Sequence, residues 1–251
     1  MIGVEVDGAG TPLVCVHGST ADRSRWAPIR ASLAETFELH LMDRRGRGAS
    51  TQESSAPYAL EREADDVIAV AEAAGGAVRL LGHSYGALIS LEVLRLRADL
   101  VEVAVLYEPP FDTPGHRIAP PEAFGVVTER LDAGDREGAL IAFYELIIGV
   151  DPTPLRRLPI WQARLAAVHT LVREGEIGLS YVPDARAFRG VDVPVHVLAG
   201  TTSPPAFGAA ARTATGALPR AELHWLEGYG HTMIDADPIG FTALVKDLPR
   251  R

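Results

Sequence analysis

Ser84 lies in a stretch that could make a hydroxyl group into a nucleophile. The apolar residues before it predict a short buried strand, Val78–Leu81, and the apolar spacing after it predicts a helix. Gly82 and Gly86 lie two residues either side of Ser84, where the lack of a Cβ lets strand and helix pack around a tight turn. In this G-x-S-x-G pattern the serine stands at the tip of the turn, beside the free N–H groups of the helix. We therefore expect Ser84 to attack a substrate.

The base that Ser84 requires is predicted to be His231. A serine hydroxyl is a poor nucleophile at neutral pH, and a neutral imidazole within hydrogen-bond distance can take its proton. His231 follows the last expected strand, Ala221–Leu226, in a glycine-rich loop that can bend towards Ser84. His83 is next to Ser84, but its side chain is expected to point away. The other histidines are assigned to the framework (His17, His40, His196 and His224) or to the surface of an insertion (His116 and His169).

The elements that would position these residues alternate between strands and helices. This alternation predicts an α/β fold, with a mostly parallel central sheet and helices on both faces. The alternation stops between residues 111 and 190, which we expect to form a helical cap (lid) inserted into a core of residues 1–110 and 191–251. The helices expected in the cap are Phe124–Ala133, Arg136–Ile148 and Ile160–Arg173, and a core helix is expected at Trp26–Phe37. Ser84 and His231 follow expected strands, so they should share one edge of the sheet.

These residues resemble the alpha/beta-hydrolase family, in its serine hydrolase branch with a helical cap. The G-x-S-x-G stretch is similar to the nucleophile elbow of that family, and Ser84 precedes His231 as the family order requires. The resemblance implies an oxyanion hole made by the backbone N–H groups of Ser19, which follows a His-Gly pair, and Tyr85. It also implies that Asp43–Ser50, similar to the family loop D-x-R-G-x-G-x-S, has a structural role.

The acid of the expected catalytic triad departs from the common family pattern. The usual aspartate would follow the strand Val195–Ala199, but that position holds Ser203, which carries no charge. Some relatives place the acid after the strand that follows the elbow helix, and that position here is Glu108. Glu108 is therefore the predicted acid; the alternatives are that it only braces the following Pro-Pro turn and that a Ser-His dyad operates. Two nearby carboxylates, Asp235 and Asp237, are expected to cap the closing helix.

The composition excludes several other classes of function. With 24 Lys and Arg against 33 Asp and Glu, the net charge is −9, which disfavours nucleic acid as a partner. No apolar run approaches the length of a membrane span, and the N-terminus does not have the pattern of a signal peptide. The single cysteine, Cys15, lies in an apolar run and is expected to be a small buried hydrophobe. These features predict a cytoplasmic protein with a small-molecule substrate, no membrane partner, no cofactor and no metal; they say nothing of its oligomeric state.

The leading hypothesis is a serine hydrolase that cleaves a small or medium apolar ester, lactone or thioester through an acyl-enzyme. Two alternatives remain from the sequence. The same residues could catalyse elimination, cyclisation or carbon–carbon bond cleavage in secondary metabolism. The fold could also serve as a non-catalytic small-molecule receptor, since a fold does not by itself fix a function.

Overall fold

The central feature of the molecule is a seven-stranded sheet. The computed structural model describes residues 1–50, 57–120 and 122–249, and the strand order is β1-β3-β2-β4-β5-β6-β7. The strands are β1 (Val4–Gly8), β2 (Thr11–Val16), β3 (Phe37–Met42), β4 (Val78–His83), β5 (Val101–Tyr107), β6 (Val195–Gly200) and β7 (Ala221–Leu226). Only β1 is antiparallel to its neighbour, and the other pairings are parallel. The predicted mostly parallel sheet is therefore confirmed.

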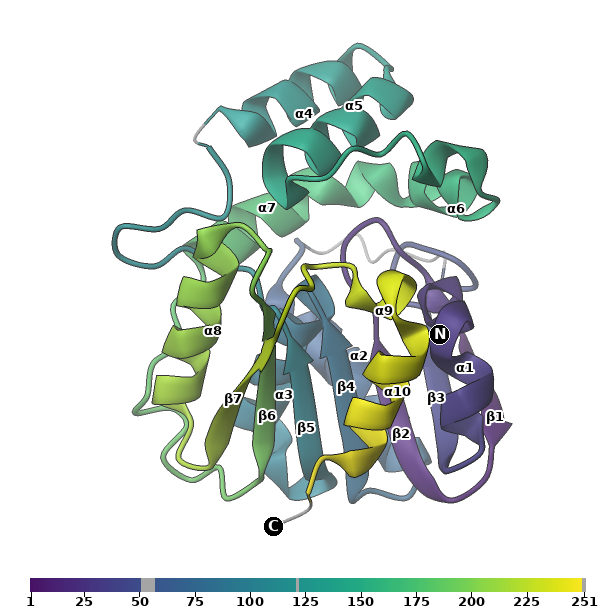
Figure 1. Ribbon diagram of the computed structural model, residues 1–251, viewed down its shortest axis with the longest axis vertical. Helices are drawn as coiled ribbons and strands as arrows, with labels where there is room; N and C mark the ends of the chain where they lie inside the picture. The colour runs from purple at the N-terminus through teal and green to yellow at the C-terminus, as the bar shows by residue number, and fades with distance from the viewer. Residues whose placement is uncertain (51–56, 121, 250–251) are drawn as a thin grey trace.

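Helices cover both faces of this sheet (Figure 1). One face packs against α2 (Leu60–Ala73), α3 (Tyr85–Arg97) and α8 (Pro205–Ala217), and the other against α1 (Ala27–Ala34), α9 (Met233–Ala236) and α10 (Pro238–Asp247). Successive residues of a strand alternate between the two cores: Leu80 packs in the first and Leu81 in the second. Because both faces are covered, β4 is buried along its whole length.

Four further helices lie together beyond one end of the sheet, above the core helices in Figure 1. They are α4 (Ala123–Asp132), α5 (Arg136–Phe143), α6 (Ile160–Ala167) and α7 (Leu171–Ser180). Their apolar side chains form a third hydrophobic cluster, which also takes in Ala206 and Phe207 of α8. These helices form the cap of the molecule. None of the helices in the described residues is long and apolar enough to span a bilayer.

Some predicted helix boundaries were wrong. The helix expected at Trp26–Phe37 is a 3₁₀ turn (Arg23–Trp26) followed by α1, and Phe37 begins β3 instead, where it packs with other residues of the core. In the cap, the second expected helix ends in a π-helical turn at Tyr144–Ile148, and the third divides into α6 and α7 at a 3₁₀ turn. The ends of these helices are determined by packing and strand pairing with residues far away in the sequence. The local spacing of apolar residues contains no information on such contacts.

Candidate active site

Ser84 lies at the turn between β4 and α3 in a strained conformation, with φ +56° and ψ −125°. Residues other than glycine rarely adopt a positive φ, and they keep it only where the surrounding structure enforces it. Ser84 N donates a hydrogen bond to Tyr107 O at 2.8 Å. A Cβ on Gly82 would lie 2.7 Å from Cα of the α3 residue Ala87, and one on Gly86 would lie 2.0 Å from the carbonyl oxygen of a β2 residue. Both positions therefore require glycine.

The loop after β2 presses against this turn. A Cβ on Gly18 would lie 2.8 Å from Cβ of Ser84, and Thr20 holds a positive φ of 55°. Ser19 and Tyr85 line the same cavity as Ser84. Within the described residues neither backbone N–H donates a hydrogen bond, so each is available to an acceptor on a bound molecule. The structure thus brings the two residues of the expected oxyanion hole to the Ser84 hydroxyl.

Glu108 and His231 are joined by a hydrogen bond although 123 residues separate them in sequence. His231 Nδ1 lies 2.5 Å from Glu108 Oε2, and Glu108 is fully buried. The other carboxylate oxygen, Oε1, accepts from Gly200 N at 2.8 Å. Because a carboxylate accepts, Nδ1 carries the proton, and Nε2 of a neutral ring is left as the acceptor.

The neighbouring carboxylates and Ser203 have other surroundings. Ser203 Oγ is buried and has no hydrogen-bond partner in the described part of the chain. Asp237 caps α10 by accepting from Gly240 N at 2.9 Å, as expected. Asp235 was also expected to cap this helix, but that prediction was wrong: it lies in α9 and pairs with Arg25 at 2.8 Å. Of the candidates considered, Glu108 is the one that the structure places on the imidazole.

Ser84 and His231 line one cavity, together with Gly18 and Ser19. Ser84 is 7% and His231 6% exposed, so little water reaches either side chain. Among the described residues no hydrogen bond joins Ser84 Oγ to the His231 ring, and such bonds are often long until a substrate binds.

Two side chains hold that loop in place, and the sequence did not single out either of them for this role. His83, expected to point away from Ser84, has its Nε2 3.0 Å from the His231 carbonyl oxygen, to which it donates, and it lines the cavity. Tyr107 donates its hydroxyl proton to Gly230 O and accepts from Met233 N at 3.2 Å. Burial first, and then electrostatic repulsion from the neighbouring Arg25 guanidinium, holds the pKa of His83 well below its usual value, so His83 stays neutral. It therefore acts as a fixed donor to the loop.

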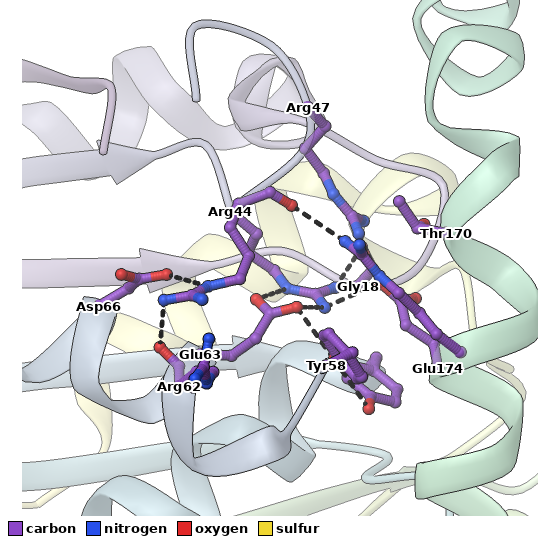
Figure 2. Close-up of polar contacts among 12 residues, drawn as sticks. Gly18, Arg44, Arg47, Tyr58, Arg62, Glu63, Asp66, Thr170 and Glu174 are labelled. Carbon is purple, nitrogen blue, oxygen red and sulfur yellow. Dashed lines mark hydrogen bonds and ion pairs between the residues drawn. The ribbon is translucent and has the colours of Figure 1, made fainter. Parts of the chain in front are cut away.

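Figure 2 shows a buried cluster of charges, one member of which, Glu174, lines a cavity together with Ser84. Arg44 binds Glu63 at 2.7 Å and Glu174 at 2.9 Å, and Arg47 binds Glu174 at 2.5 Å. Burial alone would raise the pKa of Glu174, but the charges of Arg44 and Arg47, with hydrogen bonds from the Ser19 hydroxyl and Arg47, lower it to about 2. Since Glu174 belongs to α7, this cluster ties the cap to the core beside the site.

The loop predicted to be structural supports that cluster. Asp43 accepts from Arg23 N and Ala49 N, each at 2.8 Å, which fixes the turn that carries Arg44 and Arg47. His17 accepts from Arg44 N through Nε2 at 3.1 Å and donates Nδ1–H to Gly18 O. Burial and the charges of both arginines keep the pKa of His17 well below its usual value. His17 therefore braces the loop.

Two cavities meet at Ser84. The first is mainly apolar and lies under the cap. Its lining includes Phe124, Ile147, Leu171 and Phe207. The second is also lined in part by apolar side chains, but it holds His231, Arg25 and Arg164, and for these residues we call it the polar cavity. Ser19, Ser84, Phe143 and Ile148 line both, so a molecule bound at Ser84 can extend into each.

A group of side chains that could bind a metal lies away from Ser84. Among the described residues, ligand atoms of His196, Glu222 and His224 lie within 4.8 Å of one another. His196 is the second residue of β6, whereas Glu108 binds Gly200 at the other end of that strand. His196 Nδ1 lies 3.0 Å from His224 Nε2, and its Nε2 donates to Pro249 O. Both ring nitrogens of His196 therefore already have hydrogen-bond partners within the protein.

A family model with the description alpha/beta hydrolase family matches residues 13–244 of the chain. This chain belongs to the alpha/beta hydrolase family. The matched range includes the cap, whereas the motifs that resemble the family all lie in the core. The predicted family and fold class are therefore confirmed.

Two curated alpha/beta hydrolases match parts of this one. N-formylmaleamate deformylase of Pseudomonas putida is 33% identical over 114 residues, which are 45% of this chain and 42% of that protein. The 2-(acetamidomethylene)succinate hydrolase of Mesorhizobium japonicum is 28% identical over 138 residues, 54% of this chain and 46% of that protein. The matched segments thus span less than half the length of each relative.

Solved alpha/beta hydrolases match over nearly the whole chain. An alpha/beta hydrolase from Sphaerobacter thermophilus superposes with a TM-score of 0.82 at 29% identity, covering 97% of this chain and 94% of that one. Esterase RhEst1 from Rhodococcus sp. gives a TM-score of 0.77 at 26% identity, with 98% and 93% covered. The cap is included in both coverages, so the arrangement of core and cap is shared with esterase-like relatives.

Proposed function

We propose that this alpha/beta hydrolase cleaves a small or medium apolar ester, lactone or thioester through an acyl-enzyme formed on Ser84. The observation that carries the proposal is the 2.5 Å hydrogen bond between His231 Nδ1 and the buried Glu108, in a cavity that Ser84 also lines. A carboxylate on Nδ1 fixes the tautomer in which Nε2 accepts a proton, and it stabilises the imidazolium that forms.

In the first half of the proposed reaction Ser84 is acylated. His231 Nε2 takes the proton of the Ser84 hydroxyl while Oγ attacks the carbonyl carbon of the substrate. The carbonyl π bond opens, and the resulting oxyanion accepts hydrogen bonds from the N–H groups of Ser19 and Tyr85. The intermediate then collapses, the bond to the leaving group breaks, and the His231 imidazolium gives its proton to the leaving oxygen or sulfur.

In the second half water releases the acyl group. His231 removes a proton from a water molecule, whose oxygen attacks the acyl carbon, and the same two N–H groups hold the second oxyanion. Collapse breaks the bond to Ser84 Oγ, which takes the proton back from His231. The carboxylic acid leaves, and the residues return to their starting protonation states.

The relatives support a hydrolytic reaction at a carbonyl group. One is a deformylase, and another, a pimeloyl-[acyl-carrier protein] methyl ester esterase of Xanthomonas campestris, is 31% identical over 107 residues. The apolar cavity under the cap supports an apolar acyl group, since its lining is aliphatic and aromatic apart from a few polar residues such as Ser19 and Glu174.

Rapid-mixing kinetics with 4-nitrophenyl butyrate test this proposal. An acyl-enzyme predicts a burst of 4-nitrophenol equal to one molecule per active site when deacylation is slower, followed by a linear phase. Ser84→Ala should lose both phases, and Ser203→Ala is the matched control, which should keep them. Hydrolysis that survives intact in Ser84→Ala would contradict the proposal. If His231 instead acts alone as a base in an elimination or a carbon–carbon cleavage, no acyl adduct forms on Ser84.

A further inference from the structure

Two buried arginines enter the polar cavity beside Ser84 from different parts of the chain. Arg25 comes from the 3₁₀ turn of the core and Arg164 from α6 of the cap. They are 2% and 8% exposed, and both line the cavity that holds His231. Guanidinium groups are rarely buried to this degree unless an anion pairs with them.

The hydrogen-bond donors of these arginines are only partly used. Arg25 Nη1 binds Asp235 at 2.8 Å, but its Nε and Nη2 are buried without a partner in the described part of the chain. Arg164 Nη1 reaches Thr20 Oγ1 at 3.4 Å, and its Nε has no partner there. No carboxylate among the described residues pairs with Arg164. Its guanidinium also lies 5.7 Å from the centre of the Tyr144 ring, a contact that holds the group without neutralising it.

The charges around the cavity do not balance. Arg25 and Arg164 supply two positive charges and Asp235, at its rim with a 40% exposed side chain, supplies one negative charge. Glu108, which binds His231, does not line this cavity. A cavity with a net positive charge and free planar donors is suited to a carboxylate, whose two oxygens match the fork of a guanidinium.

The position of His231 indicates which part of a substrate would occupy this cavity. In the proposed reaction His231 returns a proton to the leaving group, so that group must lie beside it. His231 lines the polar cavity and is not part of the apolar one. The acyl group therefore extends under the cap, and the leaving group extends towards Arg25 and Arg164.

We propose that the substrate is an ester or thioester whose leaving alcohol or thiol bears a carboxylate, and that Arg164 and Arg25 bind this carboxylate. The proposal rests on the proposed function: the acyl group stays apolar, and the leaving group is narrowed to one that bears a carboxylate. Thr20 links the subsite to the reaction: it follows Ser19, the proposed oxyanion donor, and its hydroxyl accepts from Arg164. A bound carboxylate would thus fix the scissile carbonyl relative to that donor.

A matched pair of esters tests the proposal. In 4-(butanoyloxy)benzoate the leaving phenol carries a carboxylate, and in 4-(butanoyloxy)benzamide it carries a neutral amide of similar shape. We expect kcat/KM of the wild-type protein to be about 10- to 100-fold higher for the benzoate, as charge-assisted hydrogen bonds predict. Arg164→Met should reduce this ratio by about tenfold or more. Arg157→Met, at an exposed arginine of the same cap, should keep the wild-type ratio.

The results separate this proposal from the proposed function. Hydrolysis of both esters through Ser84 with equal kcat/KM would overturn the carboxylate subsite and leave the serine hydrolase intact. Equal losses for both esters in Arg164→Met would also overturn it, because they indicate a merely structural arginine.

If neither ester is cleaved, that result counts against the proposed function. A binding measurement can still test the carboxylate subsite in that case. Calorimetry on Ser84→Ala should detect 4-hydroxybenzoate more tightly bound than 4-hydroxybenzamide by about tenfold or more. The double variant Ser84→Ala/Arg164→Met should lose that difference. No preference for the benzoate in Ser84→Ala would overturn the proposal.

Discussion

Glu108 is the residue on which the chemistry of this site departs from the common pattern of its family. Its backbone φ of +49° is strained, and each of its carboxylate oxygens accepts a hydrogen bond, one from His231 and one from Gly200 N. Gly200 ends β6, the strand after which the family usually places its acid. That strand supplies here a backbone donor that holds Glu108, while the Ser203 hydroxyl makes no hydrogen bond within the described residues.

Replacement of Glu108 tests its proposed role. Glu108→Gln keeps the shape of the side chain but removes the charge that stabilises the His231 imidazolium, so kcat for an ester should fall by about 10³- to 10⁴-fold. Glu227→Gln is a matched control, an exposed carboxylate in the loop that carries His231, and should retain wild-type kcat. A Glu108→Gln enzyme with full turnover would show that the acid is another residue.

At the scale of elements, the site depends on four segments that follow β2, β4, β5 and β7, and on how closely they approach one another. Gly18 and Gly86 permit contacts that a Cβ would prevent, with Ser84 Cβ at 2.8 Å and with Val16 O at 2.0 Å. His83 and Tyr107 hold the backbone on both sides of His231. The positions of the reacting groups are therefore set by backbone contacts between neighbouring strand ends.

Two glycine substitutions compare a position that needs glycine with one that does not. Gly86→Ala should lower the free energy of unfolding by about 3 kcal/mol or more, because its Cβ would overlap the β2 backbone. Gly125→Ala, on an exposed face of α4 with no atom within 4 Å of the added Cβ, should raise it by about 0.5 to 1 kcal/mol. Urea unfolding measures both. Similar stability in the two variants would mean that the elbow packs less tightly than described.

At the scale of the whole molecule, the cap and core meet through charges as well as through apolar contacts. Glu174 of α7 binds Arg44 and Arg47 of the core, and all three are buried. Removing one member of such a cluster leaves uncompensated charge in the interior, which is strongly destabilising. The cap is thereby fixed over the apolar cavity.

The low pKa of Glu174 gives this connection a pH signature. Its folded pKa of about 2 lies below the ordinary value of 4.5, so the charged form stabilises the fold above about pH 4.5 and the contribution is lost as the pH falls towards 2. Glu174→Gln should be less stable than wild type by about 3 kcal/mol at pH 7, and the difference should shrink below pH 4.5.

The control for this experiment is Glu176→Gln, an exposed carboxylate on the same helix. It should change the free energy of unfolding by less than about 0.5 kcal/mol at either pH. A Glu174→Gln deficit that stays constant from pH 7 to pH 3 would show that the carboxylate charge is not its cause.

Much of the fold and the central residues of the site could be predicted from local patterns. The apolar strand before Ser84 and the glycines two residues either side of it predict the tight turn directly. Residues that follow parallel strands must lie at one edge of the sheet. Glu108 and His231 could be proposed in this way, and the structure places them 2.5 Å apart.

The residues that were missed depend on contacts between distant parts of the chain. Arg25, Arg164 and Glu174 look like ordinary surface charges in the sequence, because nothing local reports that a helix of the cap will bury them. His83 was not assigned a role because nothing in the local sequence shows that its ring meets the carbonyl oxygen of His231. Trp26–Phe37 was assigned to one helix because apolar spacing does not show that Phe37 pairs within the sheet.

The most direct test of the account is the reaction of the intact protein with a fluorophosphonate, followed by mass spectrometry of its peptides. The account predicts one adduct on Ser84, formed about 10³-fold or more slowly in His231→Ala. A folded protein that gives no adduct, or gives one at a residue other than Ser84, would contradict the claim that Ser84 and His231 form a working nucleophile and base.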